Sequence, residues 1–132
     1  MQRIRLAAIA AATTSAAVLA AAPAAPAAYR LTTGIYDCYA YNSSTGFSNY
    51  MGSVRFLGGG RYEHTFGRDK QRFEDKTTGR YRIRGRRIVF KGGAMAKTPG
   101  RIHDTEPGRA PSFEVWVDGE PSGVTCTYVE KP

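Results

Sequence analysis

The residues best suited to binding chemistry in this chain are cations gathered in one short segment. They occur at almost every second position between 80 and 91: Arg80, Arg82, Arg84, Arg87 and Lys91. Guanidinium groups bind phosphate, sulfate and carboxylate groups through paired N–H donors. The spacing predicts a surface that binds a polyanion or an acidic protein. The alternative is a solvated face screened by salt and partly neutralised by Asp69, Glu74 and Asp75.

A second candidate surface combines the single tryptophan with a polar segment. Trp116 falls on the outward side of an alternating stretch, where it would form a platform for a sugar or a protein, or be covered by segment 92–111. Segment 42–50 is rich in Ser, Asn and aromatic residues, as adaptable binding loops are. The predicted partner-binding residues are therefore Asn42, Phe47, Tyr50 and Trp116.

Three further side chains have the chemistry of general acids and bases: Glu63, His64 and His103. They would suit a small secreted hydrolase such as a ribonuclease. No spacing motif connects them, and His64 is better explained as a hydrogen-bonded histidine near the end of a core. We name no catalytic residue, and we expect no cofactor and no metal site, because the loop cluster 103–106 lacks enough ligands for a metal ion.

The first 27 residues have the features of an export signal. A short start with Arg3 and Arg5 precedes an alanine-rich apolar run, and Ala25 and Ala27 supply small residues before a cleavage point. We expect a signal peptide at 1–27 and one secreted domain at 28–132, without membrane insertion after cleavage. Removing the two arginines lowers the formal net charge from +8 to +6, so the domain remains basic.

Export gives the two cysteines a structural meaning. Cys38 and Cys126 lie 88 positions apart, and in an oxidising compartment two thiols in a small domain usually pair. Closing so long a loop stabilises a fold by on the order of 4–5 kcal/mol in the chain-entropy model. We therefore predict a disulfide between the first and last strands.

The mature chain alternates with a period of two between glycine-rich breaks, which is typical of β-strands. The expected strands are 34–41, 52–57, 61–66, 80–84, 86–91, 112–118 and 124–130, with an eighth around 101–103. This pattern predicts an all-β fold, a single small antiparallel β-barrel or sandwich of seven or eight meandering strands. A two-residue turn at Gly85 would pair Ile83 with Ile88 and Tyr81 with Phe90 on the buried face.

The same pattern carries a resemblance. The opening Gly34-Ile35-Tyr36, the meander of short strands and the closing strand with Cys126 resemble the small secreted β-barrel proteins of bacteria. More distantly they are similar to lipocalin- and avidin-type barrels, in which a Gly-x-Trp opens the first strand and Tyr36 stands in place of that Trp. The resemblance implies the fold and transfers no ligand residues.

Together these features predict a secreted, monomeric, non-catalytic binding protein. It would use loops and the basic hairpin face to bind an extracellular protein, a polyanionic polymer or a small-molecule ligand. A small secreted hydrolase and a protease-inhibitor-like barrel are the alternatives.

Overall fold

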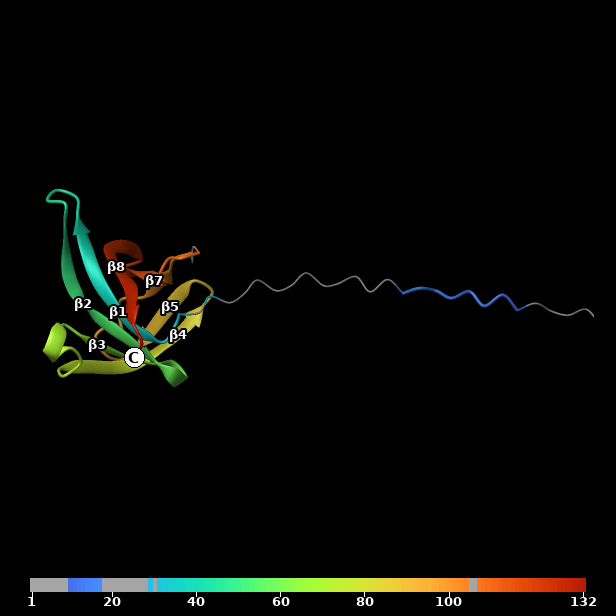
Figure 1. Ribbon diagram of the computed structural model, residues 1–132, viewed down its shortest axis with the longest axis horizontal. Helices are drawn as coiled ribbons and strands as arrows, with labels where there is room; N and C mark the ends of the chain where they lie inside the picture. The colour runs from blue at the N-terminus through green and yellow to red at the C-terminus, as the bar shows by residue number, and fades with distance from the viewer. Residues whose placement is uncertain (1–9, 18–28, 30, 105–106) are drawn as a thin grey trace, which may run out of the picture.

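The computed structural model describes residues 10–17, 29, 31–104 and 107–132, and the folded part is a closed barrel of eight antiparallel strands (Figure 1). The strands are β1 (Gly34–Asn42), β2 (Phe47–Leu57), β3 (Arg61–Thr65), β4 (Lys76–Arg84), β5 (Arg87–Lys91), β6 (Gly100–Ile102), β7 (Ser112–Val117) and β8 (Glu120–Glu130). Each strand pairs with the next along the chain, which confirms the all-β meander.

The predicted signal peptide at 1–27 lies outside the described residues except for 10–17, which form neither helix nor strand. Within the described part of the chain, no helix is long and apolar enough to cross a membrane.

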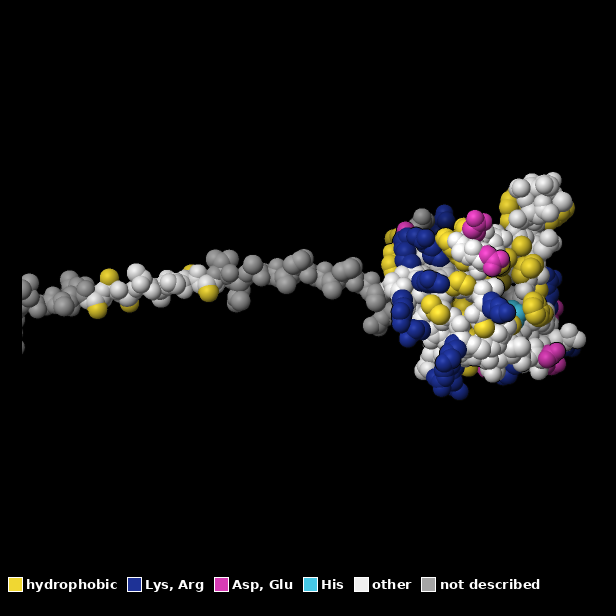
Figure 2. All heavy atoms as spheres, turned by 180° about the vertical axis from the view of Figure 1, so that it is seen from behind, with side chains coloured by type: hydrophobic (Ala, Val, Ile, Leu, Met, Phe, Trp, Pro, Cys, Tyr) yellow, Lys and Arg dark blue, Asp and Glu magenta, His cyan; other side chains and the backbone are white. Residues whose placement is uncertain are grey.

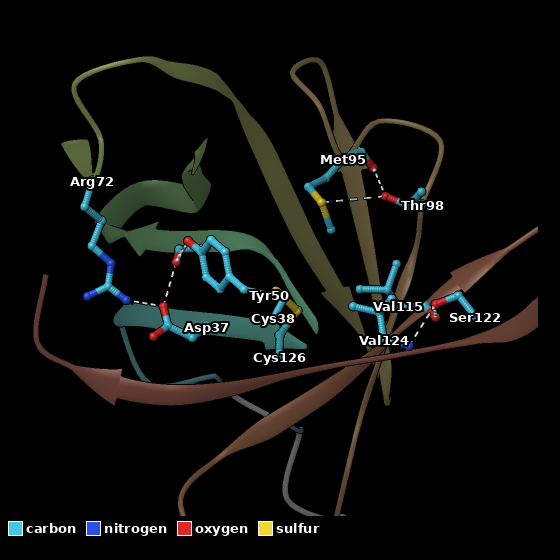
Figure 3. Close-up of a disulfide and its surroundings, with 11 residues drawn as sticks. Asp37, Cys38, Tyr50, Arg72, Met95, Thr98, Val115, Ser122, Val124 and Cys126 are labelled. Carbon is cyan, nitrogen blue, oxygen red and sulfur yellow. Dashed lines mark hydrogen bonds and ion pairs between the residues drawn. A yellow bond between two sulfur atoms is a disulfide. The ribbon is translucent and has the colours of Figure 1, made fainter. Parts of the chain in front are cut away.

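The barrel closes where β1 pairs with β8. Cys38 lies directly opposite Cys126 in this pairing, and the two form a disulfide that is buried in the core. Figure 3 shows the disulfide joining the two strands. The predicted link between the first and last strands is confirmed.

Aromatic rings pack against one another in the interior of the barrel. Phe56 is fully buried, and its ring centroid lies 5.2 Å from that of Tyr36 and 5.7 Å from that of Phe113. Tyr62 and Phe90 make a further edge-on contact at 4.9 Å. Such edge-to-face pairs add to the free energy gained by removing the rings from water.

The motif Gly-x-Tyr recurs at residues 34–36, 60–62 and 79–81, where each glycine is expected to begin a strand and each tyrosine to face inward, and the structure places all three tyrosines in this core. Tyr36 and Tyr62 are fully buried, and Tyr81 packs against the cluster. Gly79 does not begin its strand, because β4 already starts at Lys76. Its role is close approach, since a Cβ at Gly79 would lie 2.5 Å from both the Tyr62 ring and the Gly92 carbonyl oxygen.

The β4–β5 hairpin has the predicted register. Ile83 pairs with Ile88 and Tyr81 with Phe90, so these four side chains point toward the core. Gly85 has a φ of 58° at the first turn position, a conformation that glycine adopts without steric cost. The opposite side of the hairpin therefore carries the cations.

Segment 42–50 is not a loop, contrary to the expectation from its composition. Only 43–46 form a turn, and Phe47 already begins β2. Pairing of β1 with β8 ends at Ala40, and pairing of β2 with β3 ends at Ser53, so the tip of the β1–β2 hairpin projects beyond the barrel wall (Figure 1). The composition of segment 42–50 correctly indicates a turn. The strands on either side of this turn were missed because both of their faces are exposed to solvent and they carry no alternating apolar pattern.

The eighth strand expected around 101–103 is confirmed as β6, which divides segment 92–111 into two shorter loops. Met95 anchors its first part in the core, where the Met95 backbone N–H donates a hydrogen bond of 3.1 Å to the Tyr62 hydroxyl. The last strand, β8, begins at Glu120, four residues earlier than predicted, because Gly123 and Pro121 within it read as turn residues.

Removing the disulfide tests the role of the barrel closure. We expect the Cys38→Ala/Cys126→Ala double variant to lose on the order of 4 kcal/mol of unfolding free energy, because the unfolded chain then regains the freedom of a long loop. Urea denaturation followed by far-UV circular dichroism measures the loss. An unchanged denaturation midpoint would show that the β1–β8 hydrogen bonds close the barrel without help.

Candidate functional site

The outer side of the barrel carries two rows of cations that run across the strands. In one row, Arg61 of β3, Arg80 of β4 and Lys91 of β5 are register partners. In the other, the register partners are Arg84 of β4, Arg87 of β5 and Arg101 of β6. Arg82 lies between the rows on β4. We call this set the cationic face: Arg61, Arg80, Arg82, Arg84, Arg87, Lys91 and Arg101.

No residue of the cationic face forms an ion pair among the described residues. Their ion pairs join other side chains, namely Arg55 and Lys76 to Glu63, Arg72 to Asp37 and Glu130, and Arg86 to Asp104. Asp69, Glu74 and Asp75, the acids expected to neutralise the face, form none of these pairs. Like charges placed directly opposite in a sheet reduce stability.

The cations are therefore a cost to the isolated fold, and their side chains are exposed to solvent. Figure 2 shows Lys and Arg side chains gathered over the side of the barrel where Figure 1 places β4 and β5.

A pocket lies at one border of the cationic face. Its volume is about 350 Å³, and it is lined by Arg84, Arg86, Arg87, Pro99, Gly100, Arg101, Trp116 and Gly119. The Arg101 guanidinium carbon lies 5.7 Å from the centre of the Trp116 ring. The tryptophan is half-buried, and its backbone N–H donates a hydrogen bond of 2.8 Å to the Pro99 carbonyl. We call this the Trp116 pocket.

The structure brings two of the predicted binding surfaces together in space and places other predicted binding residues away from them. Trp116 lies with Arg84 and Arg87 in one pocket, although the sequence treats them as two surfaces. Asn42 and Phe47 instead face each other at the tip of the β1–β2 hairpin. The Asn42 side chain accepts hydrogen bonds from the backbone N–H groups of Ser44 and Thr45, so it shapes the turn, whereas Phe47 is 72% exposed.

Tyr50 belongs to a different surface, on the outer side of β1 and β2. Its hydroxyl lies 2.6 Å from the Ser53 hydroxyl and donates a 3.0 Å hydrogen bond to the Gly67 carbonyl. The Arg68 guanidinium carbon lies 4.2 Å above its ring. A cavity of about 280 Å³ opens here, but its Arg72 is already paired with Asp37 (Figure 3) and with Glu130. The charged and polar groups of Asp37, Tyr50 and Arg72 are thus already partnered on this surface.

The three acid–base candidates do not form a common arrangement. Glu63 and His64 are consecutive in β3 and point to opposite sides of the sheet, Glu63 toward Arg55 and Lys76 and His64 toward the interior beside Phe66. His103 follows β6, where its Nδ1 lies 2.8 Å from the Ser112 hydroxyl.

Electrostatics distinguish these groups as well. Burial opposes ionisation of the Glu63 carboxyl, but hydrogen bonds and charge from Arg55 and Lys76 outweigh it, and its pKa is lowered. Burial alone lowers the pKa of the His64 imidazole. Across the described chain, no group of three His, Cys, Asp or Glu side chains could hold a metal ion.

Fold and surface together define an eight-stranded antiparallel meander barrel with a cationic outer face. Comparison with protein-family models, with curated proteins and with solved structures gave no match.

Sequence reasoning missed Arg61, Arg86 and Arg101. Arg61 and Arg101 reach the cationic face only through the β3–β4 and β5–β6 pairings, which join residues distant in sequence. The position of Arg61 could have been predicted from the repeats Gly60-Arg61-Tyr62 and Gly79-Arg80-Tyr81. Their arginines occupy equivalent positions in adjacent strands, so Arg61 lies beside Arg80.

The lowered pKa of His64 makes folding depend on pH. As pH drops below the ordinary histidine pKa of 6.5, the unfolded chain binds a proton that the buried imidazole of folded His64 does not yet bind. The unfolding free energy therefore falls as pH decreases below 6.5. Above that range His64 contributes no pH dependence. We expect His64→Gln to flatten this part of the stability profile, measured by urea denaturation at several pH values. His103→Gln is the control, and an unaltered slope in His64→Gln would contradict the assignment.

Proposed function

We propose that the domain is an exported, non-catalytic binding protein that holds an anionic polymer against its cationic face. The observation that carries this proposal is the pair of three-cation rows, whose members form no ion pair among the described residues. A folded domain gains nothing in stability from opposed like charges. Their arrangement is explained if the counter-charge is supplied from outside.

The spacing of the rows suits an extended ligand. Neighbouring strands in a sheet lie about 4.8 Å apart, so one row spans roughly 10 Å. The rows are set four residues apart on β4, at Arg80 and Arg84, which corresponds to about 13 Å along the strand. A linear polyanion can therefore contact several guanidinium groups at once, either along a row or from one row to the next.

The closed barrel supports this function by holding the cations in place. Every strand of the face is hydrogen-bonded on both sides, so the backbone positions of the arginines are already set before a ligand arrives. Rigid presentation lowers the entropy lost on binding. The proposal also accommodates the resemblance to lipocalin- and avidin-type barrels, since up-and-down barrels share this architecture. The separation of Glu63, His64 and His103 offers no support for the hydrolase alternative.

The test compares two variants with the same net charge. In Arg82→Ser/Arg84→Ser/Arg87→Ser, three cations leave the face, whereas in Lys70→Ser/Lys97→Ser/Lys131→Ser three exposed cations are removed elsewhere. Binding of purified residues 28–132 to immobilised heparin is measured across a salt titration. We expect a steep decrease of wild-type binding with salt, and a slope reduced by about 2–3 in the arginine variant because each lost contact releases about one counterion fewer.

The lysine variant should keep a slope close to that of the wild type. Thermal unfolding serves as the folding control, and the arginine variant should be at least as stable as the wild type because opposed like charges have been removed. Equal loss of binding in both variants would mean that net charge alone attracts heparin, and the proposal would then fail.

A further inference from the structure

The Trp116 pocket differs from the rest of the cationic face in its lining. Its lining combines Trp116 and Pro99 with four arginines, while Gly100 and Gly119 contribute no side chains. We propose that this pocket binds one acidic sugar unit, a saccharide ring bearing a carboxylate or sulfate group, within the polymer held by the face. The inference rests on the proposed function and specifies its ligand class.

The pocket offers two complementary kinds of contact. A sugar ring has an apolar side made of C–H groups, which an indole ring covers well while the hydroxyl groups remain in water. The anionic substituent can then be held by guanidinium donors, which match carboxylate and sulfate groups in pairs. The Arg101 guanidinium lies over the Trp116 ring, 5.7 Å from its centre, so a charged group and the stacking surface belong to the same small site.

The charges around the pocket are arranged unequally. Arg86 is occupied by its ion pair with Asp104 and lies against the Tyr29 ring at 4.9 Å. Arg84, Arg87 and Arg101 have no ion pair among the described residues, so they are the groups available to an anion. Glu114, the register partner of Arg101, ends this row with the opposite charge. The anionic group is therefore expected on the Arg84–Arg87 side of the indole.

The aromatic content of the face favours a saccharide over a single-stranded nucleic acid. Sequence-independent binding of single strands relies on several aromatic rings that stack successive bases along a basic groove. Here Trp116 is the single aromatic residue in the pocket lining. The strongly exposed rings of Tyr41, Phe47 and Phe66 lie on the β1–β2 hairpin or just after β3, away from the described cationic rows. A pocket of this size also suits one compact unit of a polymer.

The chain has one tryptophan, so its fluorescence reports on the pocket directly. Wild-type residues 28–132 are titrated at low salt with a heparin-derived tetrasaccharide, with polyphosphate of similar charge and with oligo-dT. We expect a saturable change in Trp116 emission with the tetrasaccharide. Polyphosphate should bind, as judged by calorimetry, and leave the emission unchanged. An equal emission change with polyphosphate would indicate a site for anions alone and would overturn the proposal, as would a change with oligo-dT only.

Two variants separate stacking from charge. We expect Trp116→Ala to weaken tetrasaccharide binding by about tenfold or more, the loss typical of a buried aromatic contact, while polyphosphate affinity is unchanged. Trp116→Phe keeps an aromatic ring in the site, so its affinity for the tetrasaccharide should be lower than that of the wild type but higher than that of a folded Trp116→Ala. This variant provides the test if Trp116→Ala unfolds. Unchanged tetrasaccharide affinity in Trp116→Phe and unchanged wild-type emission would overturn the pocket while leaving the cationic face intact. Failure of both polyanions to bind would instead overturn the proposed function.

Discussion

The pairing of β1 with β8 determines the outer surface on which the proposed function depends. Once these strands are joined, and linked covalently through Cys38 and Cys126, each strand has two hydrogen-bonded neighbours. The alternation of side chains then has a single outcome, with the aromatic cluster inside and every second residue of β3 to β6 outside. In an open sheet, the register of pairing alone would decide which side chains face the core, and a shift of one residue would exchange the two faces of a strand.

Closure also explains how the fold tolerates its own charge. The interior is filled by large rings such as Phe56 and Phe113, whose burial provides stabilisation that a small domain otherwise lacks. The outer side can then keep three arginines opposite one another in the row of Arg84, Arg87 and Arg101. Acidic residues elsewhere are used for structure, as where Arg72 joins the connection after β3 to β1 and β8 through Asp37 and Glu130. The aromatic core thus supplies the stability that the opposed cations of the outer face reduce.

The parts that local sequence could predict are those governed by short-range pairing. The register from Tyr81 to Phe90 follows from a two-residue turn between alternating runs. The disulfide is predicted from the expected export and the even cysteine count. The Trp116 pocket could not be predicted, because its residues come from three separated segments that meet only through the β5–β6 and β6–β7 pairings. The β1–β2 hairpin was hidden for a different reason. The first part of β2, before Gly52, extends past the wall of the barrel. Segment 47–51 therefore has no buried face, and its sequence does not alternate between apolar and polar residues.

The most direct test of this account is an NMR titration with heparin at low salt. Signals of the backbone amides, the arginine Nε–H groups and the Trp116 indole N–H can be followed separately in isotope-labelled protein. The account predicts that chemical shift changes concentrate on β4, β5, β6 and Trp116, while the tip of the β1–β2 hairpin around Phe47 is unaffected. Changes centred on that hairpin, or on the surface around Tyr50 and Arg68, would contradict it.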